Sequence, residues 1–308
     1  MYNVSLLFNT KKILYICRYE YTYFFNKSNV VALGLGYKVK NGIISSKECI
    51  SIFVNNKLSL HELLPNDIIP STYNGVITDV IDSGPITASS LTNKIRPALG
   101  GYSIGPIKGA PGGTFGCLVT DGKYYHVLTN NHIIVDKKIT KIGMPIIQPT
   151  VVDGGTIEDE IAKLSLYIPL KPQTSTSSPE NLVDCSINKI TKRSLVSTKI
   201  AFLGRPKGTA LPYISDDVMK VGRTSELTKG SIISIGATAK LTIDEAKYLF
   251  VNQIITTRMS SDGDSGSVLF DKNINAIGLL VGASNSQSLF NPIDAVLDSL
   301  KVKIVTGD

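Results

Sequence analysis

The sequence predicts an all-β protein with a small additional domain at its N-terminal end. Glycine is frequent, with 26 among 308 residues, and short β-branched and aliphatic runs are separated by turns. Three of these runs, at 115–119, 161–166 and 232–235, are typical of strands. A hydrophobic content of 43% with 19% charged residues is that of a globular chain with two or three domains. We therefore expect a large core built from strands.

Residues 1–28 are predicted to form an N-terminal extension. Its aromatic and apolar run at 13–25 is interrupted by Arg18 and Glu20, so it is too short and too charged for a membrane-spanning helix. The pattern of a basic start, a clean apolar stretch and a small-residue cleavage site is not found. We expect no secretory signal, no membrane partner and a cytoplasmic protein.

Three further segments follow the extension. Residues 29–95 alternate apolar runs with turns and include a strand at 50–54, which predicts a small α/β or β-rich leader domain. Residues 96–200 and 201–308 contain the other strand-like runs. The residues that suggest a chemical activity all lie in these last two segments.

A serine stands between glycines in a tight turn of the last segment. The turn reads Gly263-Asp264-Ser265-Gly266, and the apolar run at 268–270 follows it as a strand. A serine hydroxyl is a poor nucleophile at neutral pH unless an imidazole takes its proton and a carboxylate orients that imidazole. The turn therefore predicts Ser265 as a nucleophile and requires a histidine and an acid elsewhere.

The chain has three histidines, His61, His126 and His132. His61 lies in a polar segment far from any glycine-rich turn, and His126 lies within a strand-like run, where its ring would be packed or half exposed. His132 stands where that strand leaves the core and becomes a loop. It is the best candidate for the general base.

Asp184 is the best candidate for the acid. It opens the run at 182–190, in which apolar residues recur with the period of a strand and a carboxylate is otherwise unfavourable. The alternative for Asp184 is a strand-end residue that caps a turn. Asp136 on a lysine-rich loop and Asp153 in an Asp-Gly-Gly turn are its rivals.

In the chain order His132, Asp184, Ser265, these residues resemble the trypsin-like (chymotrypsin-fold) serine proteases. Residues 129–132, Thr-Asn-Asn-His, are similar to the threonine-alanine-alanine-histidine strand end of that superfamily, and 263–266 match its nucleophile turn. Subtilisin-like and α/β-hydrolase enzymes have other chain orders. The resemblance implies a serine endopeptidase.

The resemblance also implies a fold. It predicts two antiparallel six-stranded β-barrels of the chymotrypsin type, at 96–200 and 201–308, with the site between them and a helix at the C-terminal end. The segment 220–232 is similar to the Gly-Arg-Thr-Thr-Gly strand pair of bacterial alpha-lytic-type proteases, although Glu226 replaces the second glycine.

The leader domain carries a separate resemblance. Residues 29–38 and 75–81 resemble the leader of intracellular trypsin-like proteins related to plant narrow-leaf protein. This resemblance implies an intracellular protein.

The residues predict a mechanism in which Ser265 attacks a carbonyl, His132 accepts its proton and Asp184 holds His132. The backbone amides of Gly263 and Ser265 would bind the oxyanion, because glycine permits the unusual backbone conformation that turns an amide inward. In the resembling enzymes, the acid before the nucleophile accepts an ion pair from a newly cut amino terminus. This makes Asp264 a candidate activation sensor.

The resemblance places the substrate pocket near Met259, six residues before the nucleophile. A neutral thioether there favours a modest apolar side chain over lysine or arginine. Val281, Gly282 and Ala283 would form the opposite wall, where their backbone could pair with an extended substrate. The alternative is that all of these residues are ordinary core strand and turn.

Cysteine usage predicts neither disulfides nor a metal site. The four cysteines, Cys17, Cys49, Cys117 and Cys185, have no Cys-x-x-Cys spacing, and the three histidines are scattered. In secreted trypsin-like enzymes the position of Cys117 is bridged to the one occupied here by Ile133. An unpaired, buried thiol at Cys117 indicates a reducing compartment. We expect no cofactor.

The net charge of +7 does not indicate nucleic-acid binding, because the lysines are dispersed and no aromatic stacking motif lies beside them. Asp153 and the acidic run 158–160 lack the ligand spacing of a calcium loop. The expected partner is a protein or peptide substrate, and a homo-oligomer or an activating partner is left open. The alternative function is a proteolytically idle trypsin-like module for binding or oligomerisation.

Overall fold

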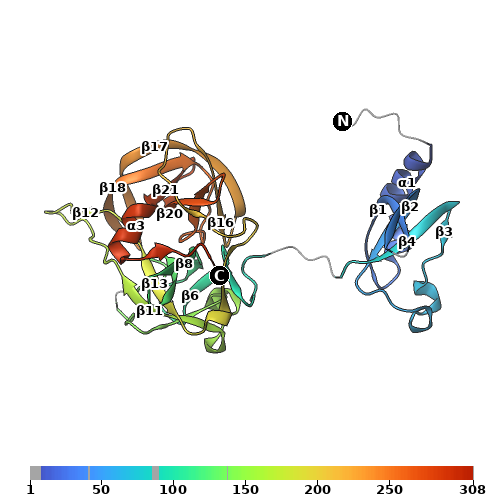
Figure 1. Ribbon diagram of the computed structural model, residues 1–308, viewed down its shortest axis with the longest axis horizontal. Coiled ribbons are helices and arrows are strands. Elements are labelled where there is room, and N and C mark those ends of the chain that lie inside the picture. Colours follow the sequence, from blue (N-terminus) through green and yellow to red (C-terminus); the bar gives the residue numbers. More distant parts are fainter. Residues whose placement is uncertain (1–7, 41, 85–89, 137, 308) are drawn as a thin grey trace. The chain divides into compact units, whose positions relative to one another are not determined.

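The computed structural model describes residues 8–40, 42–84, 90–136 and 138–307 (Figure 1). The chain divides into two compact units, Met1–Ser89 and Ser90–Asp308. None of the helices in the described part is long and apolar enough to cross a membrane.

The N-terminal unit is a small α/β domain, as the sequence predicts. Its elements are, in chain order, α1 (Phe8–Tyr19), α2 (Tyr21–Phe25), β1 (Val30–Lys40), β2 (Ile43–Val54), 3-10 turns at Leu60–Glu62 and Pro65–Asp67, β3 (Thr72–Tyr73) and β4 (Val76–Asp82). The strands form one sheet in the order β1-β2-β4-β3, in which β1 and β2 are antiparallel and β2 and β4 are parallel. The strand predicted at 50–54 lies in β2 and is confirmed.

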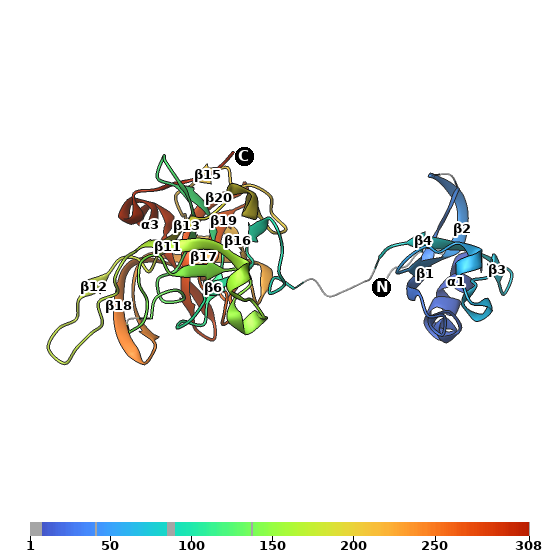
Figure 2. The same ribbon diagram turned by 90° about the horizontal axis from the view of Figure 1, so that it is seen from below.

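The helices of this unit pack on its sheet (Figure 2). Ile13 of α1 and Phe24 of α2 are fully buried and share one apolar cluster with Ile50 and Ile52 of β2. The helices of the predicted extension therefore belong to the leader domain and do not form a separate segment. Its aromatic run completes the core of the leader domain, because the sheet would otherwise expose its apolar face to water.

The second unit begins at Ser90, before the predicted boundary between residues 95 and 96. Leu91 is 1% exposed and packs in the core of this unit. The N–H of Ile95 donates to Oε1 of Gln148 at 3.1 Å. These contacts attach the residues before the predicted boundary to the first barrel.

The first barrel consists of the antiparallel strands β8-β9-β13-β11-β10-β6, extended by β22 and β7. Its elements are β5 (Ala98–Gly100), β6 (Ser103–Pro106), β7 (Gly113–Thr114), β8 (Cys117–Thr120), β9 (Tyr125–Thr129), β10 (Pro145–Ile147), 3-10 turns at Val151–Asp153, Ile157–Asp159 and Arg193–Leu195, β11 (Glu160–Tyr167), β13 (Ser186–Ile190), β14 (Val196–Ile200) and β22 (Lys303–Ile304). The N–H of Phe115 donates to the carbonyl of Tyr102 at 2.8 Å, which helps to close the ring. β14 pairs in parallel with β5.

The second barrel is a closed ring of six strands in the order β16-β17-β18-β21-β20-β19. Its elements are β16 (Asp217–Gly222), β17 (Glu226–Ile243), β18 (Ala246–Thr257), β19 (Val268–Asp271), β20 (Asn275–Ala283), β21 (Gln287–Pro292) and the helix α3 (Ile293–Leu300), with β12 (Glu180–Asn181) and β15 (Gly208–Thr209) paired at its edges. The strand orders confirm the two predicted six-stranded barrels, and α3 is the predicted helix near the C-terminal end. Figure 1 shows how these elements are arranged.

The two barrels share a core. Cys117 and Leu128 of the first barrel lie in one apolar cluster with Val221 and Leu279 of the second. All four cysteines are free, and Cys117 is 1% exposed, as the sequence predicts. Burial raises the pKa of the Cys117 thiol to about 12.

Candidate active site

His132 and Asp184 meet where two neighbouring strands of the first barrel end. β9 and β13 are antiparallel, and Ser186 pairs with Thr129. Asp184 just before β13 therefore lies beside the residues that follow β9. The Nδ1 of His132 donates to Oδ2 of Asp184, and Oδ1 of Asp184 accepts the N–H groups of Asn131 at 2.8 Å and His132 at 3.1 Å.

Asparagine side chains hold the backbone of Asp184, which is fully buried. Nδ2 of Asn130 donates to the carbonyl of Asp184 at 2.7 Å, and the N–H of Asp184 donates to Oδ1 of Asn291 at 2.8 Å. Asn291 comes from β21 of the second barrel and donates in turn to Oε1 of Gln253 at 2.6 Å. The roles of these residues were not predicted from the sequence. Asn130 lies two positions before the candidate base, but no sequence signal points to Asn291.

The environment of His132 favours its protonated form. Burial acts to lower the pKa of His132, but the charge of Asp184 and its hydrogen bond raise it, and the carboxylate of Asp244 adds to the increase. The pKa of His132 is therefore above its ordinary value. Because Nδ1 carries the proton bound to Asp184, Nε2 is the ring nitrogen that can accept a further proton.

The Ser265 turn has the backbone expected of an anion-binding loop. Gly263 has φ of +92°, and a Cβ built there would lie 2.5 Å from Oγ1 of Thr224. Within the described part of the chain, the N–H groups of Gly263 and Ser265 donate to no protein acceptor. Both amides can therefore donate to a ligand oxygen.

The turn lies against the first barrel close to His132. The N–H of Thr114 donates to the carbonyl of Ser265 at 2.9 Å. A Cβ on Gly113 would lie 2.7 Å from that carbonyl oxygen and 2.8 Å from Cδ1 of Ile133, the residue after His132. Among the described residues, no hydrogen bond joins the Ser265 hydroxyl to the His132 ring. Such bonds are often long before substrate binds.

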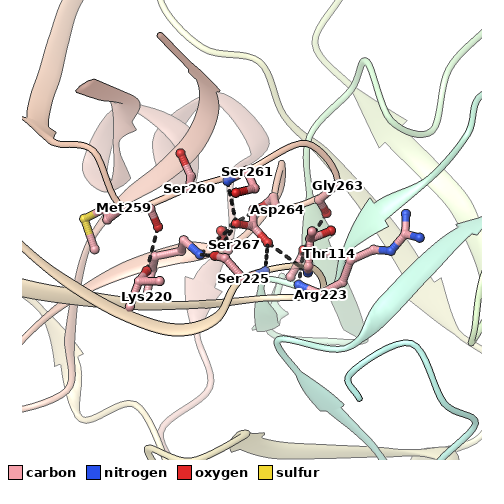
Figure 3. Close-up of polar contacts among 12 residues, drawn as sticks. Thr114, Lys220, Arg223, Ser225, Met259, Ser260, Ser261, Gly263, Asp264 and Ser267 are labelled. Carbon is pink, nitrogen blue, oxygen red and sulfur yellow. Dashed lines mark hydrogen bonds and ion pairs between the residues drawn. The ribbon is translucent and has the colours of Figure 1, made fainter. Parts of the chain in front are cut away.

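Asp264 is paired inside the second barrel (Figure 3). Its Oδ2 lies 2.9 Å from Nζ of Lys220 and accepts the hydroxyl of Ser225 at 2.5 Å. Its Oδ1 accepts the N–H groups of Thr224 at 2.9 Å and Ser225 at 3.0 Å. The resemblance assigned this ion pair to a newly cut amino terminus, and that expectation is wrong for this structure, because Lys220 occupies the position.

Burial and charge act against each other in this pair. Burial lowers the pKa of Lys220, and Asp264 offsets only part of the decrease. For Asp264, burial acts to raise the pKa, but the charge of Lys220 and the hydrogen bonds from Ser225 lower it below its ordinary value.

The residues predicted to bind substrate differ in exposure. Met259 is 3% exposed and packs in the core of the second barrel with Ile232 and Leu280. Val281 is also buried, Gly282 is half-buried and Ala283 is exposed. The predicted apolar preference stays a prediction.

The rival residues have other partners. Nε2 of His126 lies 3.3 Å from Oδ2 of Asp121, and His61 is exposed. The Oδ1 of Asp136 accepts the N–H of Lys138 at 2.8 Å, within its own loop. The carboxylate of Asp153, the other rival of Asp184, is bound by Arg223.

A groove of about 620 Å³ adjoins His132. The first barrel contributes Tyr167 and Leu170 to its lining, and the β17–β18 hairpin contributes Ile243 and Tyr248. The candidate base therefore faces a space that is large enough for substrate side chains.

Solved structures share the fold of the second unit. Protease A of Thermobifida fusca is 19% identical with a TM-score of 0.50, and the match covers 68% of this chain and 98% of that protein. An alpha-lytic protease homolog, N4, is 13% identical with a TM-score of 0.50, and the match covers 67% of this chain and 98% of that protein. No protein-family model and no curated protein matches the chain.

These likenesses and the strand order define the class of fold. The second unit is a chymotrypsin-type double β-barrel, and the candidate residues lie where its two barrels meet. At such low sequence identity the likeness shows the fold alone, so the activity has to be argued from the site.

Proposed function

We propose that the protein is a serine endopeptidase. Ser265 is the nucleophile, His132 the general base and acid, and Asp184 the residue that orients His132. The observation that carries this proposal is the hydrogen bond from Nδ1 of His132 to the buried carboxylate of Asp184. It leaves Nε2 to take a proton, and the unbonded amides of Gly263 and Ser265 can stabilise the negative charge that develops.

In the proposed reaction, Oγ of Ser265 attacks the scissile carbonyl carbon while Nε2 of His132 takes the hydroxyl proton. The carbonyl oxygen becomes an oxyanion and accepts the N–H groups of Gly263 and Ser265. His132 then gives the proton to the leaving amine, and the C–N bond breaks to leave an acyl-enzyme. Water activated by the same ring hydrolyses the ester and restores Ser265.

We infer that the substrates are protein or peptide chains and that the protein works in the cytoplasm. Four free cysteines support a reducing compartment, because disulfides are common in secreted proteins and rare where thiols are kept reduced. The resemblance of the leader to intracellular trypsin-like proteins points in the same direction.

A proteolytically idle binding or oligomerisation module is the second candidate. It is favoured by the missing hydrogen bond between Ser265 and His132 in the described structure. An enzyme that acts only when a partner or ligand orders the cleft is a variant of the first candidate.

Labelling with a fluorophosphonate probe tests the proposal. We expect the wild-type protein to be labelled and Ser265→Ala and His132→Ala to remain unlabelled. Ser261→Ala is the matched control, because it removes an exposed hydroxyl from the same turn and should label normally. Digestion of a peptide library then tests the apolar preference. Intact protein that is not labelled, with or without added cell extract, would contradict the endopeptidase proposal and favour the binding module.

A further inference from the structure

Arg223 of the second barrel forms an ion pair with Asp153 of the first barrel. It lies in the turn between β16 and β17, and its Nη2 donates to Oδ1 of Asp153 at 2.7 Å. Asp153 ends a 3-10 turn of the first barrel, where its Oδ2 accepts the hydroxyls of Ser103 at 2.5 Å and Thr150 at 3.3 Å. The acid is thus held in place by neutral donors of its own barrel.

The same arginine lies against the Gly263 turn (Figure 3). A Cβ built on Gly263 would be 3.3 Å from Nη1 and 3.5 Å from Cδ of Arg223. The N–H of Arg223 donates to Oγ1 of Thr114 at 3.0 Å, and that hydroxyl donates to the carbonyl of Gly263 at 3.0 Å. Thr114 belongs to β7 of the first barrel. The side chain of Arg223 packs beside Gly263, and its backbone is linked through Thr114 to the Gly263 carbonyl.

The pair is not arranged for maximal stability. The side chains of Arg223 and Asp153 are 16% and 10% exposed, so both charges are largely removed from water. The Nε of Arg223 is buried and has no partner in the described structure. Desolvation offsets much of the attraction in such pairs, and an unsatisfied buried donor adds a further cost. A role in positioning explains the pair better than a contribution to folding.

We propose that Arg223 is a positioning residue of the active site and that Asp153 holds it in place. Together they fix the Gly263 turn against the first barrel, so that the oxyanion-binding amides keep one geometry. This inference rests on the proposed peptidase function. It assigns to Asp153 and Arg223 a role in transition-state binding, although neither touches the reacting atoms.

The test compares Arg223→Met, Arg223→Lys and Asp153→Asn in the full-length protein. The rate constant for fluorophosphonate labelling of Ser265 should fall by about 10- to 100-fold in Arg223→Met and Asp153→Asn, because small displacements of catalytic groups have effects of this size. In the double variant that combines Arg223→Met with Asp153→Asn, Ser265 should be labelled no more slowly than in either single variant. Arg223→Lys should recover only part of the rate, because an ammonium lacks the second planar nitrogen that lies beside Gly263.

Lys94→Met is the matched control. Lys94 pairs with Asp159, another acid in a 3-10 turn of the first barrel, but among the described residues no hydrogen bond or ion pair joins it to the Gly263 turn. Ser265 of the Lys94→Met variant should therefore be labelled at the wild-type rate. A second readout uses a peptide aldehyde, whose adduct with Ser265 needs the oxyanion amides, and the corresponding peptide alcohol, which forms no adduct. A positioning role predicts that the Arg223 and Asp153 variants bind the aldehyde more weakly and the alcohol unchanged.

The outcomes separate the two proposals. Wild-type protein that is never labelled refutes the peptidase function and this inference with it. If the wild type is labelled, and Arg223→Met and Asp153→Asn are labelled at the same rate as the wild type, this inference is overturned and the peptidase proposal stands. The inference is also overturned if the variants bind the aldehyde and the alcohol with equally weakened affinity. The same holds if the loss of labelling follows the loss of thermal stability across all variants, including Lys94→Met. If Arg223→Met does not fold, the isosteric Asp153→Asn decides the question.

Discussion

The ammonium of Lys220 lies 2.9 Å from Oδ2 of Asp264, and neither side chain is exposed to solvent. Asp264 immediately precedes Ser265, and its other carboxylate oxygen binds backbone N–H groups of Thr224 and Ser225. The shape of the nucleophile turn is thus fixed from inside the second barrel. In the proposed enzyme, no cleavage is needed to supply this cation.

Lys220→Met is expected to destabilise the protein and to abolish labelling of Ser265. Removing one partner of a buried ion pair leaves an uncompensated charge and typically costs about 3–5 kcal/mol. Denaturant unfolding of the variant measures this loss in the free energy of unfolding. Lys229→Met, on the exposed side of β17, is the control and should unfold like the wild type. A Lys220→Met protein that is as stable and as reactive as wild type would contradict the role of the pair.

The labelling rate is expected to fall at high pH as Lys220 loses its proton. Burial lowers the pKa of Lys220, so this loss should begin below the ordinary lysine value. The protonated form is the one that pairs with Asp264, and the loss therefore occurs as pH rises through the lowered pKa. In Lys220→Arg the decrease in labelling rate should move to higher pH, because a guanidinium stays protonated. Identical alkaline limbs in both proteins, measured from pH 7 to pH 11, would show that another group is responsible.

At low pH the labelling rate of Ser265 is expected to fall when Nε2 of His132 becomes protonated. Asp184 raises the pKa of His132 against the effect of burial, so this limb should lie above about 6.5, the ordinary value for histidine. Asp184→Asn removes the charge and should move the limb to lower pH while slowing the reaction. His126→Asn is the control, because burial lowers the pKa of His126 and this residue is not part of the site. A limb that moves in His126→Asn and not in Asp184→Asn would refute the assignment.

Gly263→Val is expected to lower the labelling rate by on the order of 100- to 1,000-fold, the usual effect of losing one oxyanion donor. The new side chain would have to adopt φ of +92° and would meet Oγ1 of Thr224. Gly204→Val tests backbone strain alone, because Gly204 also has φ of +92° but has nothing within 4 Å of its Cβ position. Gly204→Val should lose some thermal stability and keep its reactivity. Equal effects of the two substitutions on labelling would argue against a special role for Gly263.

Much of the fold could be predicted from the sequence because its signals are local. Strand periodicity and turn glycines indicated the all-β body, and the resemblance to trypsin-like serine proteases, carried by His132, Asp184 and Ser265, implied two barrels. The helices at the N-terminal end were not foreseen, because the aromatic run from Ile13 to Phe25 looks like an isolated apolar stretch. Only the apolar face of β2 shows what this run covers.

The sequence by itself determined the chemical groups of the candidate site: one serine in a glycine turn, one histidine at a strand end and one acid at the start of a strand. Each of these depends on residue type and near neighbours, which a sequence displays directly. Only the tertiary structure decided which polar and charged groups are paired. Lys220 and Asp264 are 44 positions apart, and Asp184 and Asn291 are 107 apart. Such pairs form only when the barrels close, because barrel closure brings distant strands together and removes their polar groups from water.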